Sequence, residues 1–124
     1  MSTKSYIPER NDIVWLDFEP TKGKEIGKYR PALVLSARLY HEKTGLLICC
    51  PISTSIRGGA TEVPLDNLDQ PSVVAASLIQ TLSWTDRKVK FIAHADAGVL
   101  REVLMRILPL IGAEELFRRG TAHE

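Results

Sequence analysis

Residues 19–30 (EPTKGKEIGKYR) gather side chains that could bind a phosphate group. The segment holds four cations, two glycines and a proline, and it shows no period that would hold it in a strand or a helix. Arg30 ends it, directly before an apolar run that opens at Pro31. A guanidinium offers a planar fork of donors that matches phosphoryl oxygens. The composition fits a phosphate-binding loop, but an ordinary solvated loop rich in lysine has the same composition.

Three hydroxyl side chains, Ser53, Thr54 and Ser55, follow the predicted strand over residues 45–52. In an antiparallel barrel the loop after this strand can lie next to the start of the preceding strand, over residues 32–36, which would bring the hydroxyls beside Arg30. Serine and threonine are also common turn residues that hydrogen-bond their own backbone. The combination with Arg30, rather than the three hydroxyls by themselves, points to a site.

Short strands must position these residues, because apolar segments alternate with turn signals along most of the chain. The predicted strands cover residues 12–18, 32–36, 45–52, 61–65 and 87–93, and residues 73–76 and 78–83 form one bent strand or two short ones. One helical turn is expected over residues 38–43.

The C-terminal region is the only convincingly helical part of the sequence. The apolar residues within 99–111 recur at a three-to-four spacing, which builds a single apolar face. Asp96 is the predicted N-cap, and Gly112 is the predicted stop. Pro109 should bend or fray the last turn.

These elements predict a mainly β fold with a C-terminal α-helix, in which the strands form a small SH3-like antiparallel barrel. A chain of 124 residues can bury enough surface to fold as one domain. We expect that domain over residues 1–112, followed by a polar tail over residues 113–124.

The charge balance and apolar runs narrow the function classes further. There are 16 Lys and Arg against 15 Asp and Glu, and the net charge of +1 excludes the uniformly basic coat of a non-specific nucleic-acid packager. The apolar runs fall short of the roughly 20 residues that span a bilayer, and the first ten residues do not read as a secretory signal. We expect a cytoplasmic protein with no membrane partner.

The cysteines and histidines give no signal for a metal or a cofactor. Cys49 and Cys50 are adjacent, so a strand would point them to opposite faces, where they are poorly placed to bond each other. We expect buried, reduced thiols. His41, His94 and His123 are scattered, with no second ligand at metal spacing. No metal site and no cofactor are predicted.

Five collinear blocks carry a resemblance to a known family. They are residues 12–23 (DIVWLDFEPTKG), Glu25 with residues 29–36 (YRPALVLS), residues 43–45 (KTG), residues 51–54 (PIST) and residues 107–112 (ILPLIG). From about Tyr6 to Gly112 the chain resembles the MazF/PemK (Kid) toxins of bacterial toxin–antitoxin systems. The resemblance implies a CcdB/MazF-like barrel, a homodimer, and a ribosome-independent endoribonuclease that cuts single-stranded RNA at short sequences without a metal. It also implies a cognate MazE/PemI-like antitoxin.

The resemblance implies roles for individual residues. Arg30 matches the catalytic arginine that precedes proline, and Ser53 falls on the partner hydroxyl, which is usually a threonine. Thr54 could assist or substitute for Ser53. Metal-free cleavage uses the ribose 2′-OH as an internal nucleophile, and Glu25 is one candidate to accept its proton. The residues implied to contact RNA are Lys22, Lys24, Lys28, Arg57, Ser77 and Gln80.

Residues 77–81 depart from the family pattern. Many members carry an Asp–Gln pair and then a basic residue at these positions, whereas this chain has the sequence SLIQT. Leu78 cannot hydrogen-bond a base edge, and Ser77 cannot act as an acid or a base at neutral pH. Two alternatives therefore stay open. One is a weakened module that dimerises and binds antitoxin or RNA with little cleavage, and the other is a CcdB-like inhibitor of gyrase.

Overall fold

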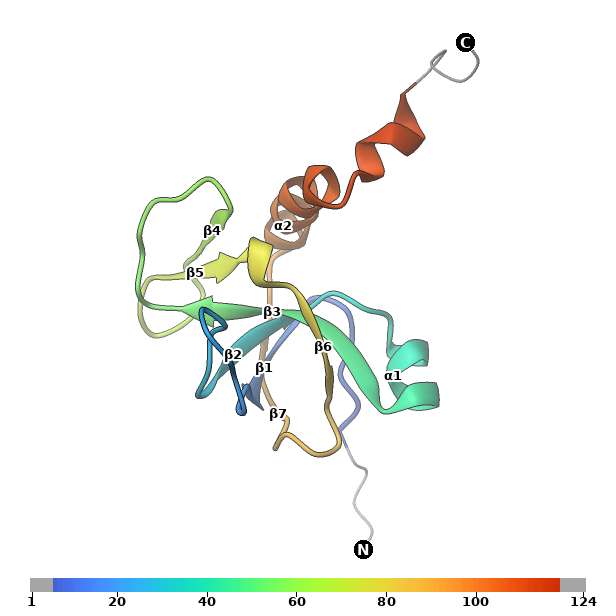
Figure 1. The fold of residues 1–124 in the computed structure, drawn as a ribbon. Helices are drawn as coiled ribbons and strands as arrows, with labels where there is room; N and C mark the ends of the chain where they lie inside the picture. The colour runs from blue at the N-terminus through green and yellow to red at the C-terminus, as the bar shows by residue number, and fades with distance from the viewer. Residues whose placement is uncertain (1–5, 119–124) are drawn as a thin grey trace, which may run out of the picture.

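The computed structural model describes residues 6–118, which form one curled antiparallel sheet with a short helix directly before its longest strand and a longer helix after its last strand (Figure 1). The strands are β1 (Asp12–Asp17), β2 (Tyr29–Val34), β3 (Leu46–Ser53), β4 (Glu62–Leu65), β5 (Ser72–Ala75), β6 (Gln80–Ser83) and β7 (Lys90–His94). The helices are α1 (Arg38–Thr44) and α2 (Ala97–Leu110), and the 3₁₀ turns are η1 (Ala76–Leu78) and η2 (Ala113–Phe117).

The sheet runs in the order β4-β5-β3-β2-β1-β7, and β6 also pairs with β3. One edge of β3 pairs with β2, and its other edge pairs first with β6 and then with β5. The short turn η1 separates β5 from β6 and lets the chain bend along β3. The segment over residues 73–83 therefore forms two short strands, the second of the two predicted possibilities.

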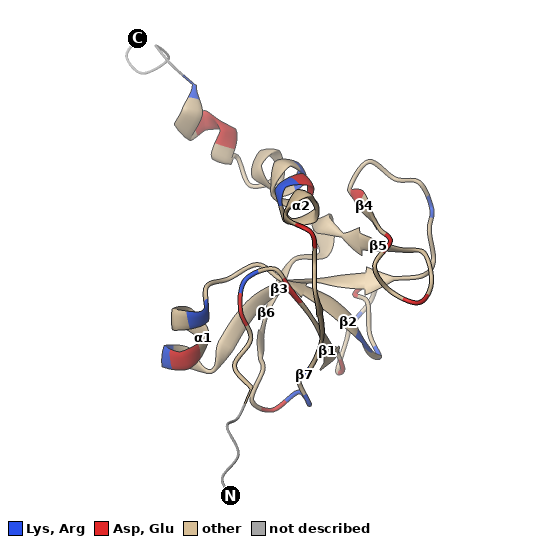
Figure 2. Cartoon of the chain, turned by 180° about the vertical axis from the view of Figure 1, so that it is seen from behind, with Lys and Arg blue, Asp and Glu red and all other residues tan. Residues whose placement is uncertain are grey.

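Both faces of the central strands are buried, because consecutive residues point to opposite sides of the sheet. Ile13 and Cys50 belong to an apolar cluster that also contains Val103 and Ile107 of α2. Val14 joins the other cluster on the opposite face. Figure 2 shows β3 without a charged residue, as expected for a strand covered on both sides.

Cys49 and Cys50 lie in different clusters, as the alternation of a strand requires. Both thiols are free and buried, which confirms the sequence prediction. Burial raises the pKa of Cys50 to about 12 and raises the pKa of Cys49 further above its ordinary value. Both therefore stay protonated and act as small apolar side chains.

The predicted C-terminal helix is present, and α2 packs against β4 and η1 (Figure 1). The helix continues through Pro109 to Leu110, and Gly112 adopts a φ of +77°, which suits the stop predicted there. The predicted N-cap position of Asp96 is confirmed. Asp96 is the N-cap residue, but its carboxylate remains exposed and the backbone carbonyl accepts the N–H of Val99 at 2.9 Å instead.

The predicted strand over residues 87–93 begins later, at Lys90. Lys88 has a φ of +58°, in the left-handed region, so the extended conformation cannot start before it. Arg87 instead donates from Nη1 to the carbonyl oxygens of Asp17 at 2.9 Å and Glu19 at 2.8 Å. Its side chain thus joins the turn before β7 to the loop after β1.

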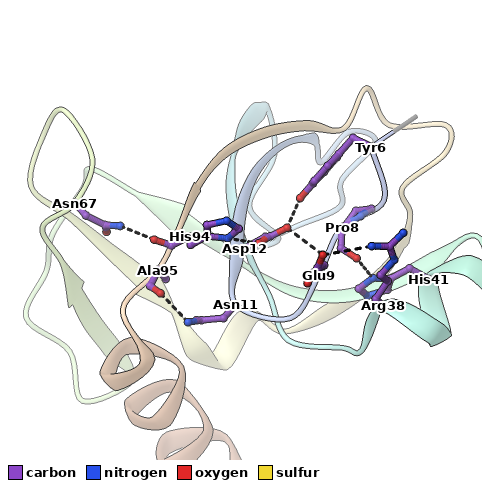
Figure 3. Close-up of polar contacts among 10 residues, drawn as sticks. All are labelled: Tyr6, Pro8, Glu9, Asn11, Asp12, Arg38, His41, Asn67, His94 and Ala95. Carbon is purple, nitrogen blue, oxygen red and sulfur yellow. Dashed lines mark hydrogen bonds and ion pairs between the residues drawn. The ribbon is translucent and has the colours of Figure 1, made fainter. Parts of the chain in front are cut away.

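Asp12 anchors the N-terminal segment to the sheet (Figure 3). Its buried carboxylate accepts hydrogen bonds from the hydroxyl of Tyr6, from the backbone N–H of Glu9 at 3.0 Å and from Nδ1 of His94 at 2.8 Å. Burial and the Asp12 carboxylate raise the pKa of the Tyr6 phenol, so Tyr6 stays a donor.

Among residues 6–118, no helix has the length and apolar character needed to cross a membrane.

His41 is a buried ring held between two oxygen atoms. Its Nδ1 lies 2.6 Å from the carbonyl oxygen of Pro8, and its Nε2 lies 2.6 Å from Oγ of Ser36. A neutral ring with its proton on Nδ1 fits both contacts, because Nδ1–H donates to the carbonyl and Nε2 accepts from the hydroxyl. Burial, with a smaller contribution from Arg10, lowers the pKa of His41.

We expect the free energy of unfolding to fall when the pH drops below about 6.5, the ordinary pKa of histidine. Because folding lowers the pKa of His41, the unfolded chain takes up the proton first. The contribution is up to about 1.4 kcal/mol for each pH unit between the two pKa values. Urea denaturation at pH 7 and pH 5.5 measures the difference in the free energy of unfolding between the two pH values. His41→Gln should lose part of the pH dependence, and an unchanged dependence would contradict this assignment.

Candidate active site

The register of β2 and β3 brings Arg30 toward the hydroxyls that follow β3. Ala32 pairs with Pro51, and continuing the same antiparallel register by two residues puts Arg30 opposite Ser53. Directly opposite residues have side chains on the same face of a sheet. Both residues line one surface pocket of about 350 Å³. Its lining residues are Lys28, Tyr29, Arg30, Pro31, Ile52, Ser53, Thr54 and Ser55.

Backbone carbonyls orient the guanidinium of Arg30. Its Nε donates to the carbonyl oxygen of Gly27 at 2.6 Å, and its Nη1 lies 3.5 Å from the carbonyl oxygen of Ile52. The side chain is half-buried, and burial lowers the pKa of the guanidinium from its ordinary value. Arginine remains a cation at neutral pH. These contacts use Nε and Nη1, and within residues 6–118 Nη2 makes no hydrogen bond, so it can donate to an anion.

Ser53 ends β3 and hydrogen-bonds the backbone that follows, whereas Thr54 is the next residue and is exposed. Oγ of Ser53 accepts the backbone N–H of Ser55 at 3.0 Å, which gives the turn expected of a serine at this position. The proton of the Ser53 hydroxyl is then available to a bound oxyanion. Thr54 is exposed and lines the same pocket.

The loop after β1 is closed at its root by Glu19. Oε2 of Glu19 accepts the backbone N–H of Lys28 at 2.8 Å, and Lys28 has a φ of +74°. A Cβ on Gly27 would lie 2.4 Å from that same oxygen, so any side chain at this position would displace the Glu19 carboxylate. The N–H of Phe18 bonds the carbonyl of Lys28 at 2.9 Å. The carbonyl of Gly27, and with it Arg30, is held by these contacts.

Sequence reasoning missed the roles of Glu19 and Arg87. Their shortest contacts are with loop backbone, and no residue spacing marks such contacts. The residue that could have been suspected is Gly27, because a glycine next to the root of a loop often marks a close approach.

Glu25 lies beside the pocket of Arg30 rather than in it. It lines an adjacent pocket of about 300 Å³ that shares Ser53 and Ser55 with the first. Oε1 of Glu25 accepts the backbone N–H of Lys22 at 2.8 Å, so the carboxylate also closes the tip of its own loop. The other lining residues are Lys24, Ile26, Arg57, Glu62, Val73, Ala75 and Leu78.

The predicted cations are divided between these pockets and the open surface. Lys28 lines the first pocket, and Lys24 and Arg57 line the second. Lys22 is exposed and lines neither pocket. Glu62 holds the segment that carries Arg57, because its carboxylate accepts the backbone N–H groups of Arg57 at 3.1 Å and Gly58 at 2.8 Å.

Ser77 and Gln80 lie apart from both pockets. Ser77 is exposed on η1, where its Oγ accepts the hydroxyl of Thr61 at 3.3 Å. Gln80 starts β6 and pairs with Cys49, four residues before Ser53 along β3. Leu78 is the residue of this segment that reaches a pocket, and it brings an apolar side chain. Within residues 6–118, no three His, Cys, Asp or Glu side chains form a group that could hold a metal ion.

Replacing Glu19 by alanine should loosen the root of the loop while the sheet stays folded. The change removes the acceptor of the Lys28 N–H, so we expect the exchange of that amide with solvent to accelerate about tenfold or more. Hydrogen exchange followed by NMR measures the effect. Glu42→Ala, which removes an exposed carboxylate of α1, is the matched control and should leave Lys28 unchanged. Equal protection of Lys28 in all three proteins would exclude the role given to Glu19.

Comparisons with known proteins show which proteins this chain resembles. The MazF endoribonuclease toxin of Escherichia coli K12 is 39% identical over 82 residues, which cover 66% of this chain and 74% of that protein. A crystal structure of MazF from Deinococcus radiodurans superposes with a TM-score of 0.84 at 39% identity and covers 87% of this chain and 99% of that one. A MazE–MazF complex from the same organism gives a TM-score of 0.76 at 37% identity, with 87% and 98% covered.

These likenesses confirm the predicted fold class, a mainly β antiparallel sheet with a C-terminal helix. A family model described as the PemK-like, MazF-like toxin of type II toxin–antitoxin systems matches residues 9–111. The match includes β1 through α2 and the whole Arg30 pocket. The chain therefore belongs to the PemK/MazF toxin family, as its five sequence blocks predict.

Proposed function

We propose that this chain is the endoribonuclease toxin of a type II toxin–antitoxin system, and that it cuts single-stranded RNA at short sequences without a metal. The membership of the PemK/MazF family supports the toxin role, and relatives in that family carry the name endoribonuclease. The single observation that carries the chemistry is the Arg30 guanidinium, oriented by two carbonyls in a pocket that also holds the Ser53 hydroxyl.

The proposed reaction is an internal transesterification. The ribose 2′-OH loses its proton, its oxygen bonds to the adjacent phosphorus, and the bond from phosphorus to the 5′-oxygen breaks. The departing oxygen takes up a proton, which leaves a 2′,3′-cyclic phosphate on one fragment and a 5′-hydroxyl on the other. Negative charge builds on the phosphoryl oxygens in the transition state. Nη2 of Arg30, which donates to neither of the two carbonyls, meets that charge in the pocket.

Arg30 acts in this proposal as an electrostatic stabiliser rather than a base. In other enzymes, a donor that is already oriented toward developing charge lowers the activation barrier by about 3 kcal/mol. Ser53 can donate its hydroxyl proton to a phosphoryl oxygen, and Thr54 can do so from the rim. Glu25 is the candidate base, since its pocket adjoins that of Arg30 at Ser53 and Ser55 and its second carboxylate oxygen is not needed for the Lys22 contact.

The RNA backbone would follow the cations of the two adjoining pockets. Lys28 stands in the first pocket, and Lys24 and Arg57 stand in the second, so a strand that passes Arg30 meets positive charge on both sides. Lys22 would add an outer contact from the tip of the loop. Phosphate contacts of this kind position a strand but carry no sequence information.

A weakened toxin is the second candidate, and one observation favours it. Ser77 and Gln80 replace family residues that contact RNA, and both lie outside the two pockets. In this case the chain would still bind RNA and antitoxin but would cut slowly. The two candidates differ only in cleavage rate, which the Arg30 experiment below measures directly.

We also propose a homodimer, a MazE/PemI-like antitoxin and action in the cytoplasm. Exposed apolar residues at the end of α2 and in η2 offer surface that a second copy can cover. They are Met105, Leu110, Ile111, Leu116 and Phe117. The antitoxin would lay an acidic, apolar-studded segment over the loop of residues 19–30 and over Ser53, and so occlude the RNA.

Replacing Arg30 by alanine should abolish cleavage of a long RNA while the chain stays folded. The change removes the main stabiliser of the phosphoryl charge, so we expect a loss of about a hundredfold or more in rate. Arg30→Lys should recover only a small part, because a point charge does not reproduce the fork. Gel analysis of RNA fragments and circular dichroism of the variants provide the two measurements.

Arg101→Ala, on the exposed side of α2, is the matched control and should cut at the rate of the parent chain. If Arg30→Ala also cuts at that rate, the assignment of the active site is wrong. If the parent chain binds RNA but makes no fragments, the weakened module replaces the active toxin as the function.

Lys24→Ala should weaken the binding of single-stranded RNA equally for all sequences. Loss of one phosphate contact should make the slope of log affinity against log salt shallower by about 0.7, the value for one cation on a single strand. Fluorescence anisotropy with a 2′-fluoro RNA, which lacks the attacking hydroxyl, measures the slope. Lys43→Ala on α1 lies outside both pockets and is the control. An unchanged slope for Lys24→Ala would remove Lys24 from the RNA path.

A further inference from the structure

A third pocket opens on the other side of the rim formed by Pro31 and Thr54. It has a volume of about 580 Å³ and lies between β1, β2 and β7 on one side and the loop that joins β4 to β5 on the other. Its lining residues are Trp15, Pro31, Thr54, Asn67, Leu68, Asp69, Gln70, Ser72, Ile92 and Ala93. The volume is in the range of small-ligand sites.

The lining of this pocket suits a nucleobase and not a phosphate. Trp15, Pro31 and Ile92 provide an apolar floor, and the amides of Asn67 and Gln70 and the carboxylate of Asp69 come from one short loop. The lining contains no lysine or arginine, and a carboxylate repels a phosphate. Proteins that read single-stranded RNA by sequence pack an unstacked base against apolar or aromatic side chains and bond its edge to polar groups.

Hydrogen bonds hold the loop wall of the pocket in place, and an aromatic stack supports the sheet wall. Nδ2 of Asn67 donates to the carbonyl oxygen of His94 at 3.2 Å, which ties the loop to the end of β7 (Figure 3). Oγ of Ser72 donates to the carbonyl oxygen of Gln70 at 2.9 Å. On the sheet side, the ring of Trp15 stacks on the ring of Tyr29, with their centroids 5.3 Å apart and an interplanar angle of 19°. The pocket is therefore formed before a ligand enters.

Shared residues connect this pocket to the candidate active site. Pro31 and Thr54 line both this pocket and the pocket of Arg30. Tyr29 lines the pocket of Arg30 and stacks on Trp15, so one aromatic pair reaches from one pocket to the other. A nucleotide whose phosphate meets Arg30 would have a neighbouring base at this rim.

We propose that the pocket binds one unstacked RNA base next to the scissile phosphate, and that Asp69 selects a base with an exocyclic amino group over uracil. The proposal rests on the proposed function. An ionised carboxylate only accepts hydrogen bonds, so it pairs with the amino group of adenine, cytosine or guanine. Uracil has no exocyclic amino group, and its one donor on that edge, N3–H, lies between two carbonyl oxygens that repel an approaching carboxylate.

The test compares the sequences cut by the parent chain, by Asp69→Asn and by Asp66→Asn. Asp66 is an exposed aspartate that precedes the lining residues of the same loop but does not line the pocket, so it is the matched control. Each protein is incubated with an RNA pool of random sequence, and the fragment ends are sequenced. For Asp69→Asn we expect the frequency of uracil to rise about fivefold at one position beside the cut. Asp66→Asn should reproduce the profile of the parent.

An identical profile for Asp69→Asn and the parent would overturn the proposal. If the parent cuts nothing, the proposed function fails, and selection from a random 2′-fluoro RNA pool then decides the binding claim separately. If uracil is depleted at one position of the RNA bound by the parent and this depletion disappears with Asp69→Asn, the result supports the proposal. If the two proteins select uracil equally at every position, the result refutes it. If circular dichroism shows that Asp69→Asn is unfolded, Gln70→Ala takes its place in the test, because it removes a second contact to the edge of the base.

Discussion

The antiparallel register between β2 and β3 is the constraint on which the candidate site depends. It aligns Ala32 with Pro51 and, two residues further, brings the start of β2 to the end of β3. Arg30 and Ser53 come from positions more than 20 residues apart in the sequence, and no local contact would bring them together. Because both faces of these strands are buried, a slip of one residue would move Cys49 and Cys50 into each other's clusters and turn Arg30 to the other face.

Contacts within the loops fix the positions of the side chains that the strand register brings together. Glu19 holds Lys28, Gly27 accepts from Arg30, and Arg87 ties the same segment to the turn before β7. On the other side, Glu62 holds the backbone at Arg57. Carboxylates thus orient the cationic loops through backbone contacts and leave the cations themselves turned to the pockets. Such preorganisation is what electrostatic stabilisation of a transition state requires.

The sequence predicted the strands well because their signal is local. Alternation and turn residues marked most strands near the observed limits, and the periodicity of residues 99–111 marked α2. The start of β2 was placed three residues too late, at residue 32, because Tyr29 and Arg30 have no apolar pattern of their own and were assigned to the loop. The start of β7 was placed too early, since the positive φ of Lys88 has no signature in a lysine. The meeting of Arg30 with Ser53 followed from antiparallel pairing and from the family resemblance, and their catalytic roles stay predictions.

The parts of the site that could not be predicted depend on tertiary contacts. Glu19 acts through backbone atoms, and Glu25 lies in a neighbouring pocket although it belongs to the same loop as Arg30. The pocket around Asp69 draws on five separate segments, so no single motif could reveal it.

The chemistry of the RNA ends tests the central claim most directly. Purified protein is incubated with a long single-stranded RNA in the presence of EDTA, and the ends of the fragments are identified. Attack by the 2′-OH, stabilised by Arg30, predicts discrete fragments with 2′,3′-cyclic phosphate and 5′-hydroxyl ends at a rate that EDTA does not change. Fragments with 5′-phosphate and 3′-hydroxyl ends, or loss of cleavage in EDTA, would contradict the account.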